Sequence, residues 1–282
     1  MFFFRFFYII FMLLFVQVSF AQVKLGQAEI RAFYKVSAVF DSLRPTQMDL
    51  DTMLLDFSQK HSVFYDPIRR QGDSTMQAQM LKAMRSGSNF QMNRRAFGVD
   101  KNSTVIVHQY PQRGKLTFFT ENLGNDLTYE EDYPLMQWQL SEETKTLAGY
   151  TCRKASTRFR GRTWEVWYTL EVPTNFGVWK FYGLPGLIVL AKDSRGHFAF
   201  ELIGLKRLPP NTEMNSHYFG ESPKSFTKIT HKKYIAEVKK YAEDPVGYKL
   251  ALLANTPVEI KAKDNKGNQN KIKAPYNPIE FE

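Results

Sequence analysis

Hydrophobic residues recur along most of this chain in short runs, and the breaks between the runs are rich in Gly, Pro, Asn and Asp. This pattern is typical of β-strands joined by turns. From residue 104 onward the runs follow one another with no helical pattern between them, which favours antiparallel pairing because a parallel pair needs a long crossover. We predict strands at residues 29–40, 52–57, 61–65, 105–110, 116–120, 127–131, 135–140, 150–159, 164–170, 187–191 and 198–208.

Two segments have the period of a helix instead. Between residues 74 and 95, Met76, Met80 and Met84 recur every four positions and so share one face. Between residues 225 and 242, a partial apolar stripe runs among lysines and ends at an Asp-Pro pair. The expected fold is mainly β (α+β): a curved antiparallel sheet or half-open barrel with one or two packing helices.

One predicted hairpin can be aligned residue by residue. If residues 160–161 form its loop, Phe159 pairs with Arg162, and every later pair follows from that register. One face is then mostly apolar and meets the core. The other is an ion-paired outer surface. This register leaves Cys152 half exposed there beside Trp167, whereas a free cysteine is usually buried, so both expectations stay open.

A second predicted hairpin, residues 187–208, has apolar residues at both odd and even positions, and so on both faces of its strands. A strand with two apolar faces is either covered on both sides or lines a cavity for an apolar ligand. The candidate cavity residues come from this hairpin, from the segment before it and from the methionine row: Met76, Met80, Met84, Trp179, Phe181, Leu184, Ile188, Phe198 and Phe200.

Composition adds the compartment. The chain has 282 residues, a formal charge of +10 and 15% aromatic residues, many of them in the first twenty positions. There Arg5 precedes an uncharged apolar run that ends in small residues, the pattern of a secretory signal peptide over residues 1–21. The run is shorter than the 20 or so residues needed to cross a bilayer. We expect an exported protein, periplasmic or else secreted, with no transmembrane segment in its mature chain.

The mature chain is predicted to form a single β-rich domain, residues 22–260, followed by a basic loop and C-terminal tail, residues 261–282. The apolar and aromatic residues between positions 275 and 281 can dock back on the domain. In an exported protein, the excess positive charge favours anionic envelope surfaces over nucleic acid as a partner. The single cysteine excludes an intramolecular disulfide.

One string of the sequence reads Gly183-Leu184-Pro185-Gly186-Leu187-Ile188. Its glycines can take positive φ and its proline fixes φ, so we interpret it as a tight bend that leads into a strand. With residues 150–155, 159–162, 167–169 and 276–280, it resembles the GLPGLI family of exported proteins of Gram-negative bacteria. That family has no established activity, so the resemblance implies export but no catalytic residue. The segment is also similar to LolA-like lipoprotein carriers, which implies a LolA-like sheet.

We find no sequence motif for chemistry: no nucleophile elbow, paired histidine metal motif, Cys-x-x-Cys or phosphate-binding loop. The five histidines are scattered, and we expect them at the surface or in turns. The acids at 130–132 and 142–143 are interpreted as solvated turn residues. No catalytic residue, metal site or cofactor is predicted, and no enzymatic activity.

The preferred function is a non-catalytic binder or carrier of an apolar, lipid-like small molecule in the cell envelope. The alternative is an adaptor or assembly protein that docks on an outer-membrane protein complex through its basic surface and tail. Two further alternatives stay open. In the first alternative, the methionine row binds Cu(I). In the second, residues scattered along the sequence assemble the active site of a hydrolase.

Overall fold

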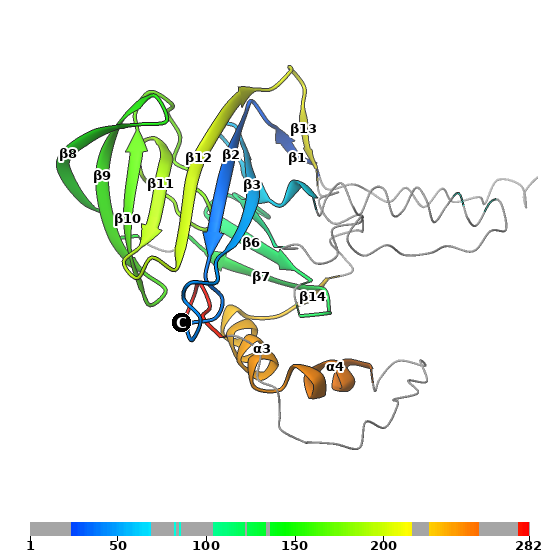
Figure 1. The fold of residues 1–282 in the computed structure, drawn as a ribbon. Helices are drawn as coiled ribbons and strands as arrows, with labels where there is room; N and C mark the ends of the chain where they lie inside the picture. Colours follow the sequence, from blue (N-terminus) through cyan, green and yellow to red (C-terminus); the bar gives the residue numbers. More distant parts are fainter. Residues whose placement is uncertain are drawn as a thin grey trace, which may run out of the picture.

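The computed structural model describes residues 24–68, 82, 85, 104–121, 123–133, 136–215, 226–253 and 276–281. Within these residues the architecture is mostly β, as the alternation predicts. One sheet of twelve strands runs in the order β14-β7-β6-β5-β4-β3-β2-β12-β11-β10-β9-β8 (Figure 1). Its neighbours pair antiparallel, apart from the parallel pair of β14 and β7.

The twelve strands are β2 (Ile30–Ala38), β3 (Asp49–Phe57), β4 (Ser62–Tyr65), β5 (Val105–His108), β6 (Lys115–Thr120), β7 (Leu127–Asp132), β8 (Gln139–Leu147), β9 (Tyr150–Phe159), β10 (Arg162–Thr169), β11 (Leu187–Asp193), β12 (Phe198–Arg207) and β14 (Thr227–Lys228). A separate pair joins β1 (Lys24–Gln27) to β13 (Glu213–Asn215). Two helices follow β14: α3 (His231–Glu243) and α4 (Pro245–Leu253). Among the described residues, no helix combines the length and apolarity needed to cross a membrane.

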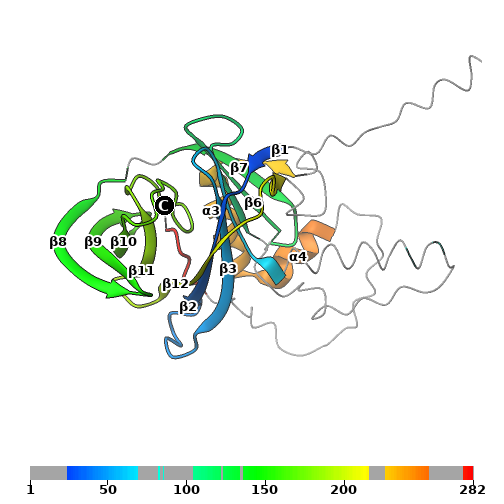
Figure 2. The same ribbon diagram turned by 90° about the horizontal axis from the view of Figure 1, so that it is seen from above.

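The sheet is curved and open, with β8 and β14 at its two edges. Figure 2 shows β8 to β11 wrapping around the loop that joins β10 to β11, residues 170–186. Side chains of this loop fill the concave side, where Phe181 is fully buried against Trp164 with ring centroids 5.0 Å apart. The loop therefore supplies the core that joins the two halves of the sheet.

The register predicted for the first hairpin is confirmed. β9 and β10 pair Phe159 with Arg162, and each later pair follows through to Cys152 opposite Thr169. The outer face is ion-paired as expected. Lys154 lies 3.4 Å from Glu165 across the strands.

Of the two expectations for Cys152, the structure confirms burial, because its side chain is fully buried. β8 pairs with β9 along this face, and Lys145 of β8 lies 3.9 Å above the ring of Trp167. Side chains of the neighbouring edge strand, such as Lys145, therefore lie over a face that the hairpin alone leaves open.

The second predicted hairpin consists of β11 and β12. β11 is buried apart from Leu190, which is partly buried, and Lys192, which is exposed. β12 buries Phe198, Phe200 and Leu202 but leaves Ile203 56% exposed. The apolar pattern at both odd and even positions thus reflects burial of both faces over most of β11, while the outer face of β12 reaches solvent.

Two predicted element boundaries are wrong. The strand expected at 135–140 is β8, which begins at Gln139 and runs through polar residues exposed on both faces. An edge strand of this kind carries no apolar alternation, and its pairing with β9 defines it.

The helix expected at 225–242 begins later, at His231, because residues 227–228 pair with β7. The side chain of Thr230 caps it by accepting a hydrogen bond from the Lys233 amide. Pro245 ends the first helical pattern but starts α4, since proline fits the first position of a helix.

The predicted helix at 74–95 falls largely outside the described residues. Met76, Met80 and Met84 all lie outside them, and Lys82 and Arg85 are helical and exposed. The methionine row therefore remains a prediction.

Candidate functional site

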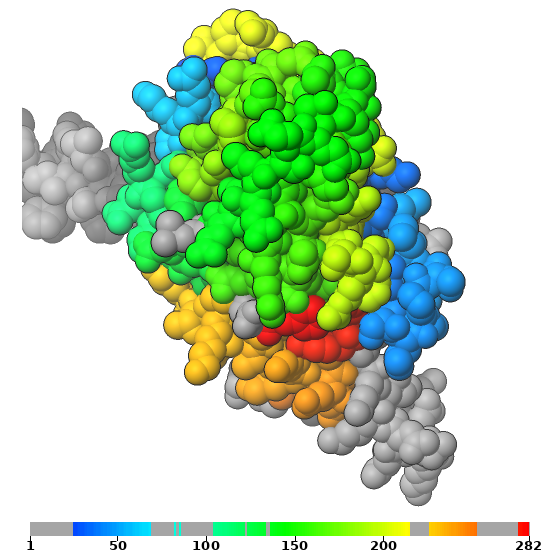
Figure 3. All heavy atoms as spheres, turned by 90° about the vertical axis from the view of Figure 1, so that its left-hand side faces the viewer, coloured from blue at the N-terminus to red at the C-terminus, as the bar shows by residue number. Residues whose placement is uncertain are grey.

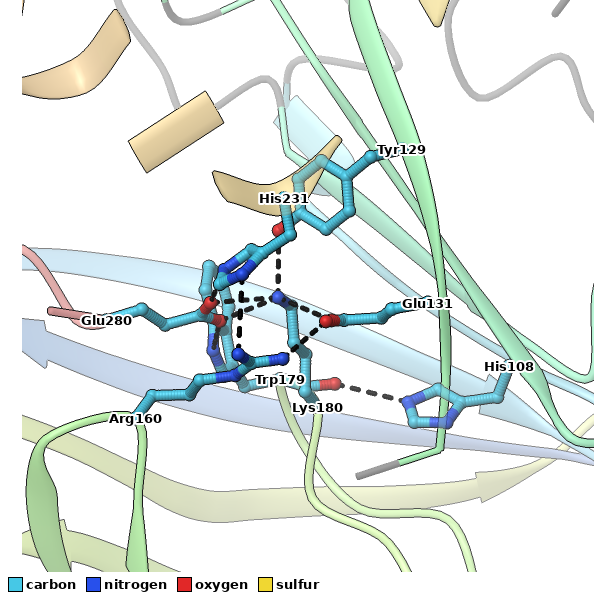
Figure 4. Close-up of polar contacts among 8 residues, drawn as sticks. All are labelled: His108, Tyr129, Glu131, Arg160, Trp179, Lys180, His231 and Glu280. Atoms are coloured by element: carbon cyan, nitrogen blue, oxygen red, sulfur yellow. Dashed lines mark hydrogen bonds and ion pairs between the residues drawn. The ribbon is translucent and has the colours of Figure 1, made fainter. Parts of the chain in front are cut away.

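A cluster of buried charged side chains lies where the loop 170–186 meets the segment 276–281 (Figure 4). At its centre is Lys180, whose side chain is fully buried. Its Nζ lies 2.8 Å from Glu131, 2.9 Å from Glu280 and 2.8 Å from the hydroxyl of Tyr129. One ammonium group thus sits between two carboxylates.

Distant parts of the chain supply these side chains. Tyr129 and Glu131 come from β7, Lys180 from the loop, and His231 is the first residue of α3. Arg160, in the β9–β10 turn, donates a hydrogen bond to Glu131 and lies 3.3 Å from the His231 ring. These contacts bring two halves of the sheet, a helix and the 276–281 segment together at one point.

Two residues at this point have positive φ although neither is glycine. Trp179 has φ of 53° and Arg160 has φ of 50°. Each is the first central residue of a tight turn, the two-residue loop 160–161 and the turn 178–181, and such turns can require positive φ at that position. Here they place the Trp179 indole and the Arg160 guanidinium in the cluster.

Glu280 is the most heavily bonded carboxylate of the cluster. Besides Lys180, it accepts a hydrogen bond from the Trp179 indole at 2.9 Å and lies 2.8 Å from His231 Nε2. Burial alone would raise the pKa of Glu280, but Lys180 and His231 outweigh it and lower that pKa to about 2. The carboxylate is therefore ionised at neutral pH.

The neighbouring aromatic groups are held in their neutral forms. Burial, and then the nearby Glu280 and Glu131, raise the pKa of the Tyr129 hydroxyl. Burial also lowers the pKa of His108 to about 4, and its Nε2 lies 3.2 Å from the backbone oxygen of Trp179. His108 thus supports the loop as a neutral ring at physiological pH.

This arrangement is suited to holding charge rather than to moving protons. Lys180, Glu131 and Glu280 each face an opposite charge at hydrogen-bonding distance. An acid with a pKa of about 2 is a poor proton donor at neutral pH. Among the described residues, no group of three or more His, Cys, Asp or Glu side chains is placed to hold a metal ion.

A second group of polar atoms lies deeper, inside the sheet. Thr157 and Trp164 are cross-strand partners on β9 and β10, and Ser62 and His108 are partners on β4 and β5. In each pair one atom per residue is buried without a hydrogen-bond partner in the described part of the chain: Thr157 Oγ1, Trp164 Nε1, Ser62 Oγ and His108 Nδ1. Such atoms are rare and costly in protein interiors.

The described members of the candidate cavity set are all buried in one hydrophobic core: Trp179, Phe181, Leu184, Ile188, Phe198 and Phe200. They contact one another and both halves of the sheet, as Phe200 does with Phe64 and Trp164. Whether this core opens to a ligand stays a prediction.

Sequence reasoning missed the charged cluster. Glu131 was expected to be a solvated turn acid, yet its side chain is 11% exposed, and His108 is fully buried rather than in a turn or at the surface. The signal lay in the motifs around Lys180 and Glu280, which carry charges beside apolar residues.

One family profile matches part of the chain. The profile of the family described as N-glycanase peptide, N-terminal domain, matches residues 134–179, which span β8 to β10 and reach Trp179. No curated protein matches the chain.

The solved structures similar to this chain include two of PNGF-II and one of a bacterial protein. PNGF-II in its P21 crystal form matches 76% of this chain and 34% of its own, with a TM-score of 0.50 and 14% identity. Its C2 form matches 76% and 33%, with a TM-score of 0.48 and 15% identity. An uncharacterized conserved protein from Thermus thermophilus matches 73% and 91%, with a TM-score of 0.34 and 8% identity.

The match to PNGF-II in its P21 crystal form shows a shared fold. The chain spans about a third of the length of PNGF-II, and the matched family profile covers less of the chain than the fold does. The likeness to this N-glycanase family is distant, and the matched strands β8 to β10 are those that wrap around the loop 170–186.

Proposed function

We propose that this chain is an exported, non-catalytic binding protein of the GLPGLI family that takes an apolar, lipid-like ligand on the concave side of its sheet. The observation that carries the proposal is the partnerless indole N–H of Trp164 and hydroxyl of Thr157, buried among aromatic rings. An apolar site with a few convergent polar groups is the usual form of a small-molecule site.

The chemistry of the pair defines the ligand class. An indole donates one hydrogen bond, and a hydroxyl both donates and accepts. A lipid-like molecule with one carbonyl or hydroxyl group would satisfy both, while its chain contacts Phe181 and Phe200. Entry would require the loop 170–186 to shift, because its side chains fill the interior.

The absence of catalysis is part of the proposal. The charged cluster supports it, since Glu280 stays ionised and faces Lys180 and His231. The fold likeness to PNGF-II fits a shared scaffold that carries different chemistry, because fold and activity are separable. Export to the periplasm rests on the signal-like residues 1–21.

Native mass spectrometry after mild purification tests the proposal. We expect a co-purifying lipid, whose occupancy falls in Trp164→Phe and Thr157→Val because each removes a polar atom while keeping most of the side chain's volume. Thr157→Val should not reduce the stability of the empty protein, because it removes a buried orphan at nearly constant volume. Trp164→Phe also leaves a small cavity, so it should cost about 1 kcal/mol or more of unfolding free energy.

Ser156→Ala is the matched control. Ser156 lies next to Thr157 on β9 but on the opposite face, where it contacts Gln139 of the edge strand. It should leave ligand occupancy unchanged. A wild-type protein that is empty and binds no fluorescent fatty acid contradicts the proposal.

A second candidate is an adaptor that docks on an outer-membrane protein complex. It is favoured by the β2–β3 hairpin, where Leu43 is 90% exposed and Leu50 is 59% exposed. Leu43→Ser should then weaken capture of the complex, whereas Ile203→Ser, on the outer face of β12, should not. Equal capture by both variants and the wild type argues against this candidate.

A further inference from the structure

The segment 276–281 lies in a groove formed by several separate elements. Figure 3 shows it in red at the surface, with the strands of the curved half above it, the β2–β3 hairpin in blue beside it and the helical region in orange below. Its backbone joins the groove through the Phe281 amide, which donates to the Arg160 carbonyl at 3.1 Å. The segment adds no strand to the sheet in the described residues.

Side chains of the groove contact the first half of the segment specifically. Arg162, which is 3% exposed, donates to the Asn277 side chain at 2.7 Å and to the Pro278 carbonyl at 2.6 and 3.1 Å. Asp193 orients this guanidinium through an ion pair of 2.7 Å. The Asn277 amide donates in turn to the Val39 carbonyl.

The second half is contacted just as closely. Glu280 is held by the Lys180 cluster described above. The Phe281 ring lies 4.7 Å from the Arg162 guanidinium and 5.8 Å from that of Arg195. Gly161 leaves room for it, because a Cβ there would lie 3.0 Å from Phe281 Cβ.

These contacts have the form of peptide recognition. An amide, a backbone carbonyl, a carboxylate and an aromatic ring are each matched by buried or semi-buried partners, and charge-assisted hydrogen bonds dominate. The connection to α4 runs over 22 residues, 254–275. A chain of that length can extend to about 70 Å, so it does not by itself dictate which copy's groove the segment enters.

We propose that this groove is a binding site for an extended Asn-Pro-x-Glu-Phe peptide, and that its occupant besides the chain's own segment is the same segment of a second copy. The same contacts form in either case, so the two occupants compete through effective concentration. Binding of a segment within its own chain commonly has an effective concentration in the millimolar range. The inference does not depend on the proposed ligand in the core.

Fluorescence anisotropy with a labelled synthetic peptide of residues 274–282 tests the site. The receiver is the full chain carrying Asn277→Ala and Glu280→Ala, which weakens its own segment and leaves the groove side chains in place. We expect saturable binding at least tenfold tighter than to the wild-type chain, whose own segment competes. A peptide with alanine at the position of Glu280 should bind at least tenfold more weakly.

Glu142→Ala is the matched control, because it removes an exposed glutamate from β8, far along the chain from the groove. It should bind the peptide as weakly as the wild type. If the double variant does not fold, Phe281→Ala takes its place, since it leaves the Lys180 cluster intact, and it should bind the peptide about threefold more tightly than the wild type. No saturable peptide binding by a cooperatively folded variant overturns the proposal.

Light scattering tests whether the segment of one copy enters the groove of a second copy. The wild-type chain should be monomeric at 10 µM and form dimers as its concentration approaches 1 mM, and an excess of the peptide should dissolve them. A chain that stays monomeric at 1 mM, or dimers that the peptide does not affect, overturns exchange between copies.

Discussion

At the scale of single residues, the bend before β11 depends on two glycines for different reasons. Both glycines can take positive φ, and Gly183 does so with φ of 96°. Gly186 does not, but a Cβ built on it would lie 2.0 Å from the Thr169 carbonyl oxygen. Gly186 is thus required by close approach of two backbones, which no sequence pattern distinguishes from a turn.

Gly186→Ala should therefore cost at least about 2 kcal/mol of unfolding free energy, because the Thr169 backbone has to move. Urea denaturation measures this cost. Gly204→Ala is the control, since its added Cβ meets only the Phe33 ring at 3.6 Å. Equal stability of the two variants would show that the bend tolerates a side chain.

Glu280 makes stability depend on pH. Its pKa falls from an ordinary 4.5 to about 2 in the folded chain. A depressed pKa stabilises the fold fully above the unfolded value, and this contribution is lost as pH falls through the folded value. The unfolding free energy of the wild type should exceed that of Glu280→Gln by about 3 kcal/mol at pH 7. This difference should shrink as the pH falls from 4.5 toward 2. Urea titrations at pH 7, 4 and 2.5 check this, and a pH-independent difference contradicts it.

At the scale of elements, the local sequence pattern determines the register of a hairpin, and neighbouring strands determine which of its residues are buried. The register of β9 and β10 follows from a two-residue loop and a period of two, so sequence predicts it. The burial of Cys152 depends on β8, which carries no apolar alternation. An edge strand is defined by what it pairs with, and that partner is absent from any local window.

The start of α3 carries a testable local signal. Thr230 caps the helix whose first residue, His231, contacts Glu280. Thr230→Ala should cost about 1 kcal/mol of unfolding free energy, whereas Thr230→Ser should retain most of the stability because its hydroxyl can still accept. Thermal unfolding followed by circular dichroism measures the stability of both variants. Equal losses of stability would show that the hydroxyl cap does not stabilise the helix.

At the scale of the whole molecule, Lys180 joins parts that lie far apart in sequence. It connects β7, the loop 170–186 and the 276–281 segment through two carboxylates. Removing one partner of a buried ion pair is far more costly than removing the pair, because the remaining charge stays desolvated. The cluster thus ties the segment to the closure of the core.

Lys180→Met should cost about 3 to 5 kcal/mol, since it leaves two buried carboxylates facing each other. Adding Glu280→Gln should recover part of that loss, so the double variant loses less than the sum of the single variants. Lys228→Met, which removes a 65% exposed lysine from its pair with Glu130, should cost under about 1 kcal/mol. Strict additivity in urea denaturation would argue against a coupled cluster.

The sequence by itself determined the mainly β class, most strand positions and the register of one hairpin, because these follow from local periodicity and turn chemistry. It also marked the segments around residues 183–188 and 276–280 as motifs, but it did not indicate what their side chains contact. Tertiary structure alone decided that Glu131, Lys180 and Glu280 meet, that β8 covers Cys152 and that the loop 170–186 fills the sheet. Those outcomes depend on contacts between residues that lie up to 100 positions or more apart in the sequence. No local pattern encodes the burial and charge pairing of such residues.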